Sequence, residues 1–376
     1  MELDDTVLNS ADKLTAADPG EMLRAVATSG AQVREAAVLT ADAGLRRLTQ
    51  DGRPRAIVVL GMGGSGIAGD VLAAVCGVEC AVPVVVVKGY TLPGWVGAND
   101  LVCGVSCSGT TEETLSAFSE AQRRGCRLLG VGSIDSPLSF IAEQGRGPFV
   151  PVRPAGRLPR AMAWGLSVPL ILAAAQLGLA DVTPEALEAA AVRLDEVAAL
   201  CRPASEAFVN PGKELALALS DTLPMAWGCS PITAVAGTRL VAQWSENAKL
   251  PALGAALPEA NHNLVVSFDG PYGSTGSGAD IFADPDDNAG RLRLLLLRDP
   301  ADEHPQVTRR AEVSKDIAES RGVPITELFT EGQSRIERLA SLVILIDYAS
   351  VYTALGLGID PTPIAAIQDL KARIAR

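Results

Sequence analysis

The sequence predicts an α/β protein with two parallel β-sheets, each flanked by helices in a flavodoxin-like, doubly wound order. Short apolar runs alternate with helical segments twice, first within residues 55–131 and again within residues 225–328. Strands that are apolar along their whole length are typical of a parallel sheet covered by helices on both faces. The chain has 376 residues, which is enough for two such domains.

The first half opens with an Ala-rich helical stretch over residues 1–50, which Asp18-Pro19-Gly20 interrupts. The elements expected after it are a strand at 55–60, a helix from the turn 61–66 to about 75, strands at 82–87 and 101–105, a helix at 111–124 and a strand at 127–131. Each of these strands is rich in Val, Ile or Leu, so we expect all four in one sheet.

Two helices are expected next, at 161–178 and 184–200, and the second has Thr183 as a capping hydroxyl before Pro184 at its first position. The elements expected in the second half are a strand at 225–227, a helix at 233–249, a strand at 292–297, a helix at 306–321, a strand at 324–328, a helix at 333–355 and a final helix ending at 370–371.

These elements predict three segments. Residues 1–155 hold an N-terminal helical extension and the first α/β domain, residues 156–204 form a helical linker, and residues 205–376 hold the second domain with a C-terminal helix. The Gly/Ser-rich stretch 270–280 and the acidic stretch 284–288 are expected to form an exposed loop.

The composition argues against several classes of function. A formal net charge of −12 and a pI of about 4.8 argue against binding to nucleic acid or to an anionic membrane. Residues 161–180 carry no charge, but Ser167, Pro169 and Gln176 interrupt them, so we expect a buried helix between two domains rather than a membrane span. The acidic, polar N-terminus does not have the pattern of a signal peptide.

The cysteines and histidines favour a cytoplasmic protein without a metal site. Seven cysteines include no Cys-x-x-Cys pair, which is typical of reduced thiols. Only two histidines are present, His262 and His304, and no Cys/His cluster has the spacing of a zinc site.

A glycine-rich turn follows the first expected strand. Gly61, Gly63 and Gly66 match the Gly-x-Gly-x-x-Gly pattern of dinucleotide-binding folds. That pattern expects an acidic residue at the end of the next strand to bind the ribose, but Lys88 and Gly89 stand there. The match is therefore poor for an NAD-binding site, and the basic residue leaves binding of NADP as an alternative. No Gly-Lys-Ser/Thr follows the turn, which excludes a P-loop.

A second, hydroxyl-rich loop lies at another strand-to-helix turn. Ser106, Ser108 and Thr111 bring three hydroxyls to the first amides of a helix, where the helix dipole favours an anion. Alternatively, Thr110 and Glu113 form a capping box, although a cap explains only one hydroxyl. Two such loops at the carboxyl ends of strands in one sheet predict one small phosphorylated ligand between them.

Glu246 and His262 lie close in sequence in the second half, on either side of a short Pro-containing segment. A carboxylate and an imidazole in one cleft are a common proton-transferring pair in cofactor-free enzymes. Taken alone, however, Glu246 could equally be a surface carboxylate paired with Lys249, and His262 a hydrogen-bonded surface group.

Six motifs occur in the order known from one family, between residues 61 and 371: GMGGSGIAGD, SCSGTTEET, LPRAMA, WSENAKLPA, LPEANHN and DPTPIAAIQDLK. Together they resemble the bifunctional phosphoglucose/phosphomannose isomerases of the sugar-isomerase (SIS) domain superfamily. SCSGTTEET alone would indicate only a SIS domain, whereas the Glu–His stretch and the terminal Lys narrow the resemblance to the isomerase branch.

The resemblance implies two SIS domains and a homodimer whose active site takes residues from both subunits. It also implies that the substrate is a small sugar phosphate. Glucose 6-phosphate or mannose 6-phosphate would be interconverted with fructose 6-phosphate through an enediolate, without metal or cofactor.

By motif position, Glu246 resembles the base that moves a proton between C2 and C1, and Arg160 resembles the residue that stabilises the enediolate. His262, supplied across the dimer, and Lys371 resemble the groups that open the sugar ring. The family's sugar and phosphate contacts fall on Gly63, Gly64, Ser65, Ser106, Ser108 and Thr111. Taken singly, Arg160 could be a linker salt bridge and Lys371 a solvated charge.

The sequence departs from the family pattern in three places. Thr110 stands where the family usually has Asn, Leu264 stands where Glu usually follows the His-Asn pair, and the loop at 265–290 is long and glycine-rich. Two alternatives stay open, a non-catalytic SIS protein that binds a sugar phosphate and regulates a partner, and an NADP-dependent oxidoreductase. An amidotransferase is disfavoured because Met1-Glu2 offers no N-terminal cysteine nucleophile.

Overall fold

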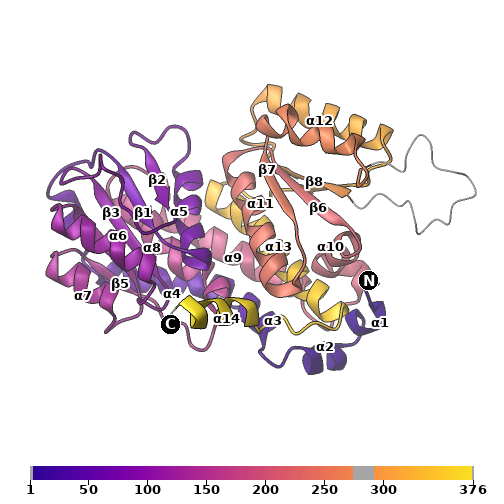
Figure 1. The fold of residues 1–376 in the computed structure, drawn as a ribbon, viewed down its shortest axis with the longest axis horizontal. Coiled ribbons are helices and arrows are strands. Elements are labelled where there is room, and N and C mark those ends of the chain that lie inside the picture. Colours follow the sequence, from indigo (N-terminus) through magenta and orange to yellow (C-terminus); the bar gives the residue numbers. More distant parts are fainter. Residues whose placement is uncertain (1–2, 274–291, 375–376) are drawn as a thin grey trace, which may run out of the picture. The chain divides into compact units, whose positions relative to one another are not determined.

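The computed structural model describes residues 3–273 and 292–374, and the chain divides into two compact units (Figure 1). The first-sheet unit comprises Ala27–Asp195 and Glu331–Ser341, and the second-sheet unit comprises Met1–Val26, Glu196–Thr330 and Leu342–Arg376. Each unit is therefore discontinuous in sequence, whereas the sequence analysis expected three continuous segments. The segment boundaries at 155 and 204 stay a prediction.

The first-sheet unit is built on five parallel strands in the order β2-β1-β3-β4-β5. They are β1 (Ile57–Leu60), β2 (Val84–Val87), β3 (Leu101–Ser106), β4 (Arg127–Gly132) and β5 (Phe149–Pro151). Every residue of β1 and β3 is buried, as central strands between two helical layers should be. The expected parallel sheet is confirmed, but β5 was missed because three residues ending in Pro151 give no strand signal.

Helices cover both faces of this sheet (Figure 1). They are α4 (Ser29–Asp42), α5 (Gly63–Cys76), α6 (Glu112–Arg123), α7 (Pro137–Gln144) and α8 (Ala163–Gln176). On one face, Phe118 of α6 and Leu138 of α7 are fully buried in a cluster with Val58 and Val102 of the sheet. On the other face, α5 approaches so closely that a Cβ on Gly69 would lie 2.9 Å from a side-chain atom of Val59.

Helix α8 covers most of the uncharged segment 161–180. It packs against α4 and α5, and its Leu166 and Val168 are fully buried. The expected buried helix is therefore confirmed, but α8 belongs to the first-sheet unit instead of lying between two domains, because the apolar faces of α4 and α5 bury it there.

The second-sheet unit has four parallel strands in the order β7-β6-β8-β9. They are β6 (Leu223–Gly228), β7 (Leu253–Ala256), β8 (Leu292–Arg298) and β9 (Ile325–Phe329). Trp227 of β6 stacks on Phe268 at a ring-centroid distance of 5.5 Å and anchors the core on the face covered by α12 (Pro305–Ser320). Strand β7 was missed because its Gly and Ala residues lack β-propensity.

The other face of this sheet is covered by α11 (Pro231–Gln243), as Figure 1 shows. The remaining helices are α1 (Asp5–Leu8), α2 (Ala11–Ala17), α3 (Met22–Ala27), α9 (Pro184–Leu200), α10 (Pro211–Leu219), α13 (Arg335–Gly356) and α14 (Ala365–Ile374). Of the expected exposed loop, residues 274–291 lie outside the described residues.

Capping residues explain several helix boundaries. The expected break after α2 is confirmed, because the Asp18 carboxylate accepts the main-chain N–H groups of Met22 and Leu23 at 2.8 and 2.9 Å. The expected start at Pro184 is confirmed too, with Thr183 Oγ1 accepting the N–H of Ala186 at 3.2 Å. Helices α7 and α10 were missed, although Ser-Pro and Asn-Pro at their starts carry the same signal.

One described helix, α13, is long and apolar enough to cross a membrane by length and composition alone. However, 94% of its apolar window is buried inside the protein, which is the environment of a core helix.

The seven cysteines give a testable consequence of this packing. All seven are unpaired, and Cys80 is the one that is not buried. Burial raises the pKa of Cys103, Cys201 and Cys229 to about 12, so these thiols stay protonated and unreactive at neutral pH.

We therefore expect a thiol reagent at pH 8 to label the native protein rapidly at one site, Cys80, and the other six only after unfolding. Cys80→Ala should remove the fast phase, whereas Cys126→Ala should leave it unchanged. A fast phase of several equivalents in the folded protein would contradict the observed burial.

Candidate active site

The glycine-rich turn at the carboxyl end of β1 leads directly into α5. Gly63 has φ +51°, a left-handed conformation that favours glycine. A Cβ on Gly64 would lie 2.8 Å from the carbonyl oxygen of Pro159 and 3.0 Å from the main-chain nitrogen of Arg160. The absence of a side chain at Gly64 therefore brings the turn against the segment that carries Arg160, one of the predicted site residues.

The turn is also bonded to the hydroxyl-rich loop after β3. The main-chain N–H of Cys107 donates to Ser65 Oγ at 3.1 Å, and Ser133 Oγ donates to the Cys107 carbonyl at 2.7 Å. Gly109 has φ +69°, and a Cβ there would lie 2.1 Å from Ser136 Oγ. The loop is thus tied to β1 on one side and to the start of α7 on the other.

Four hydroxyls gather where the two loops meet, and we call Ser65, Ser106, Ser108 and Thr111 the hydroxyl cradle. Ser106 Oγ lies 2.9 Å from Thr111 Oγ1 and 3.4 Å from Ser108 Oγ. Ser65 and Ser106 are buried, whereas Ser108 is exposed. The structure therefore brings together all four hydroxyl-bearing residues that were predicted to contact phosphate.

The start of α6 excludes the alternative of a helix cap by Thr110 and Glu113. The N-cap residue is Thr111, and its side chain makes no capping hydrogen bond to the helix because it is bonded to Ser106. Thr110 instead donates from both its amide and its hydroxyl to Ser108 Oγ, at 3.3 and 3.0 Å. The capping box of Thr110 and Glu113 does not form, and the positive end of the α6 dipole faces the hydroxyl cradle without a side-chain cap.

Two basic residues beside the cradle differ in their surroundings. Arg160 lies in a short 3₁₀ turn (Pro159–Ala161) and is only 3% exposed, which is unusual for a linker arginine. Lys88 is the basic residue that left NADP as an alternative ligand. It forms an ion pair with Asp70 of α5 at 2.6 Å. Its charge is therefore already compensated by the protein.

In the second-sheet unit, Glu246 lies in a π-helical turn (Trp244–Ala248) that continues α11. The sequence predicted a regular helix to residue 249, and the widened turn is a feature that proteins often place at functional sites. Glu246 is half-buried, between the fully buried Trp244 and Asn247. Lys249 ends the turn in the left-handed conformation and donates from Nζ to the main-chain carbonyls of Glu246 and Pro361.

A buried set of hydrogen bonds, which we call the positioning network, anchors this turn. Its members are Arg239, Gln243, Asn247, Asp347 and Ser350. The Asp347 carboxylate accepts two bonds from Arg239, at 2.8 and 2.7 Å, and one from Gln243 at 2.9 Å. Asn247 Nδ2 donates to Ser350 Oγ at 2.9 Å, and Ser350 in turn donates to the Asp347 carbonyl at 2.7 Å.

This network was not predicted from the sequence. Its members on α11 recur every four positions (239, 243, 247), so that one polar stripe runs down an otherwise apolar helix and into the π-turn. That spacing was a usable signal, because buried polar groups on one helix face require partners.

The remaining predicted groups lie on exposed surfaces. His262 ends a 3₁₀ turn (Glu259–His262) and is exposed, and Lys371 is exposed on α14, a helix without a buried residue. The other histidine, His304, caps α12 by accepting the N–H of Gln306 at 3.1 Å. His304 thus has a structural role, whereas His262 and Lys371 point to solvent.

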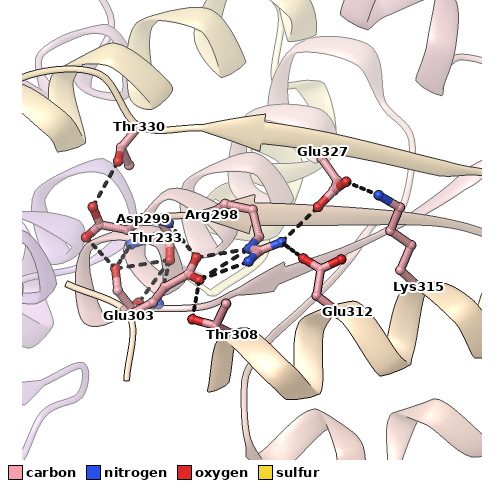
Figure 2. A network of polar contacts seen from close by, with 10 residues as sticks. Thr233, Arg298, Asp299, Glu303, Thr308, Glu312, Lys315, Glu327 and Thr330 are labelled. Atoms are coloured by element: carbon pink, nitrogen blue, oxygen red, sulfur yellow. Dashed lines mark hydrogen bonds and ion pairs between the residues drawn. The ribbon is translucent and has the colours of Figure 1, made fainter. Parts of the chain in front are cut away.

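The strand ends of the second sheet contrast with the hydroxyl cradle. There β6 and β8 hold the places that β1 and β3 hold in the first sheet. Figure 2 shows that protein side chains fill this position. Asp299, which is fully buried, accepts bonds from Ser230 at 3.0 Å and from Thr330 at 2.9 Å.

Beside Asp299, Arg298 binds three carboxylates and completes what we call the Arg298 cluster (Figure 2). Glu303, Glu312 and Glu327 lie 3.0, 2.6 and 2.9 Å from its guanidinium. A phosphate at this edge would meet carboxylates instead of free hydroxyls. The chemistry of the strand ends therefore restricts an anion site to the first sheet.

Ionisable metal ligands are not clustered in the described chain. Within residues 3–273 and 292–374, no three His, Cys, Asp or Glu side chains are grouped so that they could hold a metal ion.

Comparison with known proteins agrees with this arrangement. Residues 208–374 match the family model described as the bacterial phospho-glucose isomerase C-terminal SIS domain. A bifunctional phosphoglucose/phosphomannose isomerase of Caldicellulosiruptor bescii is 31% identical over 85% of this chain and 89% of its own length. The enzyme of the same name from Aquifex aeolicus is 33% identical over 86% of this chain and 91% of its own.

Among solved structures, a glucose-6-phosphate isomerase from Chlamydia trachomatis is similar to this chain with a TM-score of 0.64. The alignment covers 99% of this chain and 86% of the other, at 14% sequence identity. At that identity the likeness concerns the fold alone, and it agrees with two parallel sheets flanked by helices.

The Arg298 cluster generates a prediction about acid stability. Burial opposes ionisation of Glu327, but hydrogen bonds from Lys315 and Arg298 outweigh it and hold the pKa of this carboxyl below its ordinary value. A depressed folded-state pKa contributes stability that is fully present above the unfolded-state pKa, here about 4.5, and is lost as the pH falls through the lower folded-state value.

We therefore expect Glu327→Gln to lower the free energy of unfolding by about 1–3 kcal/mol at pH 7, with the difference shrinking below pH 4.5. Urea unfolding from pH 7 to pH 3.5 measures this, with Glu319→Gln, an exposed carboxylate of α12, as the control. An equal deficit for Glu327→Gln at both ends of the range would contradict the linkage.

Proposed function

Because the chain belongs to the family of bifunctional phosphoglucose/phosphomannose isomerases, we propose that it interconverts the aldose and ketose forms of hexose 6-phosphates. The substrates we propose are glucose 6-phosphate and mannose 6-phosphate, with fructose 6-phosphate as the shared ketose. The hydroxyl cradle is the observation that carries this proposal, because it joins four predicted phosphate contacts at one uncapped helix start.

The phosphate is proposed to bind in the hydroxyl cradle. Hydroxyls and the first amides of α6 can each donate a hydrogen bond to a phosphate oxygen, and the helix dipole adds to the attraction. Gly63 leaves room for the sugar to approach the main chain, since the space at its Cβ position is open, and Gly64 lets the turn lie against the segment that carries Arg160. This distribution assigns the first-sheet unit to substrate binding.

Glu246 is proposed to be the base. It would remove the proton from C2 of the open-chain aldose and return it to C1 of the enediolate, so that the C1 aldehyde becomes an alcohol and the C2 alcohol a ketone. A half-buried carboxylate held on an anchored main chain suits this transfer between adjacent carbons. Arg160, a buried cation, is proposed to stabilise the negative charge on the enediolate oxygens.

Ring opening is proposed for His262 and Lys371, which would exchange protons with the ring oxygen and the anomeric hydroxyl. Both side chains are exposed within their own chain. We propose that a homodimer forms and that His262 completes the active site of the partner subunit. Exposure of both groups supports a site completed by another subunit, since a group with no protein cover is free to enter a neighbouring pocket.

Two of the three departures from the family pattern, Thr110 and Leu264, have defined local contacts. Thr110 bonds Ser108 through both amide and hydroxyl, which supports the cradle without an Asn at this position. Leu264 packs against the core cluster around Trp227 and Phe268, so it holds the segment after His262 by apolar contact. Both substitutions are thus compatible with an active enzyme.

We further propose a cytoplasmic enzyme that works without metal or cofactor. Seven unpaired thiols are in keeping with a reducing compartment. The proton transfers above use only carboxylate, imidazole, amine and guanidinium groups of the chain.

The first prediction of this proposal is an isotope experiment. Purified protein incubated with fructose 6-phosphate and EDTA in deuterated water should form glucose 6-phosphate, mannose 6-phosphate or both, with deuterium at C2 detected by NMR. Glu246→Gln should lower kcat by about 10²–10⁴-fold, the usual contribution of a general base. Glu214→Gln, an exposed carboxylate of the same unit, is the matched control and should retain activity.

The outcomes separate the alternatives. Product without deuterium would indicate a base shielded from solvent. The rate of Glu246→Gln then decides whether Glu246 is that base. Saturable binding of fructose 6-phosphate without turnover would favour the non-catalytic, regulatory SIS protein. Full activity in Glu246→Gln would refute the assigned base.

A second prediction concerns the positioning network. Asn247→Ala removes the bond that ties the π-turn to Ser350 and should lower kcat by about 10–100-fold with little change in KM, because the base is displaced while the phosphate contacts remain. Ser245→Ala, an exposed residue of the same turn, should behave as wild type. A variant with lower stability but unchanged kcat would show that Asn247 supports only the fold.

A further inference from the structure

A groove runs along α7 in the first-sheet unit, away from every predicted active-site residue. It consists of two adjoining hollows of about 440 and 750 Å³. Both hollows share Arg47, Arg146, Gly147 and Pro148 in their linings. We call this continuous hollow the α7 groove. Each hollow by itself is in the size range of sites for small ligands and cofactors.

The larger hollow is cationic. Its lining, which lies entirely within the described residues, contains the arginines Arg47, Arg127 and Arg146. Asp51 is the one carboxylate in this lining. Arg127 is held in place because its guanidinium donates to the carbonyls of Gly52 and Asp51, each at 2.7 Å. A chain with a net charge of −12 thus keeps three arginines around one hollow, where they attract an anion.

The smaller hollow combines apolar side chains with carboxylates. Ile134 is 63% exposed and Phe140 is 50% exposed, and the half-buried Phe149 lies in the same lining. Exposed aromatic and branched side chains in a concave surface offer a stacking site for a flat ring. Asp42, Asp135 and Glu143 add hydrogen-bond acceptors to this hollow.

The charges of the groove compensate one another only at Arg127 and Asp51, which pair at 3.9 Å. Within the described residues, neither Arg47 nor Arg146 forms an ion pair, although three carboxylates share the lining of the smaller hollow with them. Arg146 has φ +57° and Asp135 has φ +53°, a conformation that is rare outside glycine and costs free energy. The main chain is thus held in an unfavourable conformation at two charged positions of the groove.

We propose that the α7 groove is a nucleotide site. The flat base stacks in the smaller hollow against Phe140 and Ile134, and its amino groups or the ribose hydroxyls donate to the carboxylates there. The phosphate chain lies in the larger hollow, where Arg47, Arg127 and Arg146 bind it. The larger hollow has three arginines and one carboxylate, whereas the smaller has three carboxylates and shares two of the arginines. This charge balance sets the orientation, because the reverse one would place phosphates beside three carboxylates.

This site is independent of the proposed isomerase site. The hydroxyl cradle contains four hydroxyls and no arginine, whereas the α7 groove contains three arginines and an apolar surface. A nucleotide bound in the groove should therefore remain bound when the cradle is saturated with sugar phosphate.

The test is isothermal titration of the full chain with ATP, in the presence of saturating fructose 6-phosphate. Adenosine and inorganic tripolyphosphate serve as probes of the two halves. We expect one ATP per chain, with adenosine and tripolyphosphate each binding at least about tenfold more weakly, since each fills one hollow only. The double variant Arg47→Ala/Arg146→Ala should weaken ATP binding by about tenfold or more, because it removes two charge-assisted contacts.

Arg46→Ala is the matched control, because Arg46 is an exposed neighbour of Arg47 that does not line the groove. It should leave ATP affinity unchanged, and Phe140→Ala should weaken it. Three results would overturn the proposal: no binding of ATP up to about 5 mM, displacement of ATP by fructose 6-phosphate, or tripolyphosphate binding as tightly as ATP. Equal ATP affinity in the double variant and the wild type would overturn it as well.

Discussion

The buried bidentate ion pair between Arg239 and Asp347 is the interaction on which the proposed chemistry of the second-sheet unit depends. Burying two charges is costly unless their remaining hydrogen-bonding groups are satisfied, and Gln243 supplies a third bond to the Asp347 carboxylate. The Asp347 carbonyl then orients Ser350, which receives the bond from Asn247. A π-helical turn is rarely stable without such support. The turn is fixed one residue from Glu246, while the Glu246 carboxylate stays partly open to a substrate.

The two sheets share a strand pattern but differ at the strand ends where doubly wound folds bind ligands. In the first sheet, the amide of Cys107 donates to Ser65 and so holds two loops together around the hydroxyl cradle. In the second sheet, Asp299 accepts the hydroxyl bonds that an anion would otherwise receive. A carboxylate of the chain therefore occupies the position that is offered to a phosphate in the first sheet. Within the described residues, the two sheets thus differ in whether a carboxylate of the chain already occupies the hydroxyls at the strand ends.

The sequence predicted the parts of this structure that depend on local chemistry. Fully apolar strands and the hydroxyls of the loop after β3 sit where their patterns indicated. The start of α6 could not be predicted, because the capping box of Thr110 and Glu113 fits the sequence as well as the observed turn of Thr111 towards Ser106. The π-turn could not be predicted either, since its anchor is a residue of α13 that lies 103 positions away. Both the start of α6 and the π-turn are decided by side-chain contacts that form in the folded structure.

An acidic protein that binds phosphorylated ligands must solve an electrostatic problem, and the cradle solves it without lysine or arginine side chains. Neutral donors lose little hydration when they bind an anion, and the dipole of α6 acts only within its first turn. The attraction of the cradle is therefore short-ranged, and the net charge of −12 repels polyanions from surfaces that carry no cluster of arginines. Buried Arg160 adds a full charge beside the glycine turn, where Gly64 brings the main chain close. In the proposed site, binding of a fixed dianion by the cradle is thus separate from stabilisation by Arg160 of a charge that exists only during reaction.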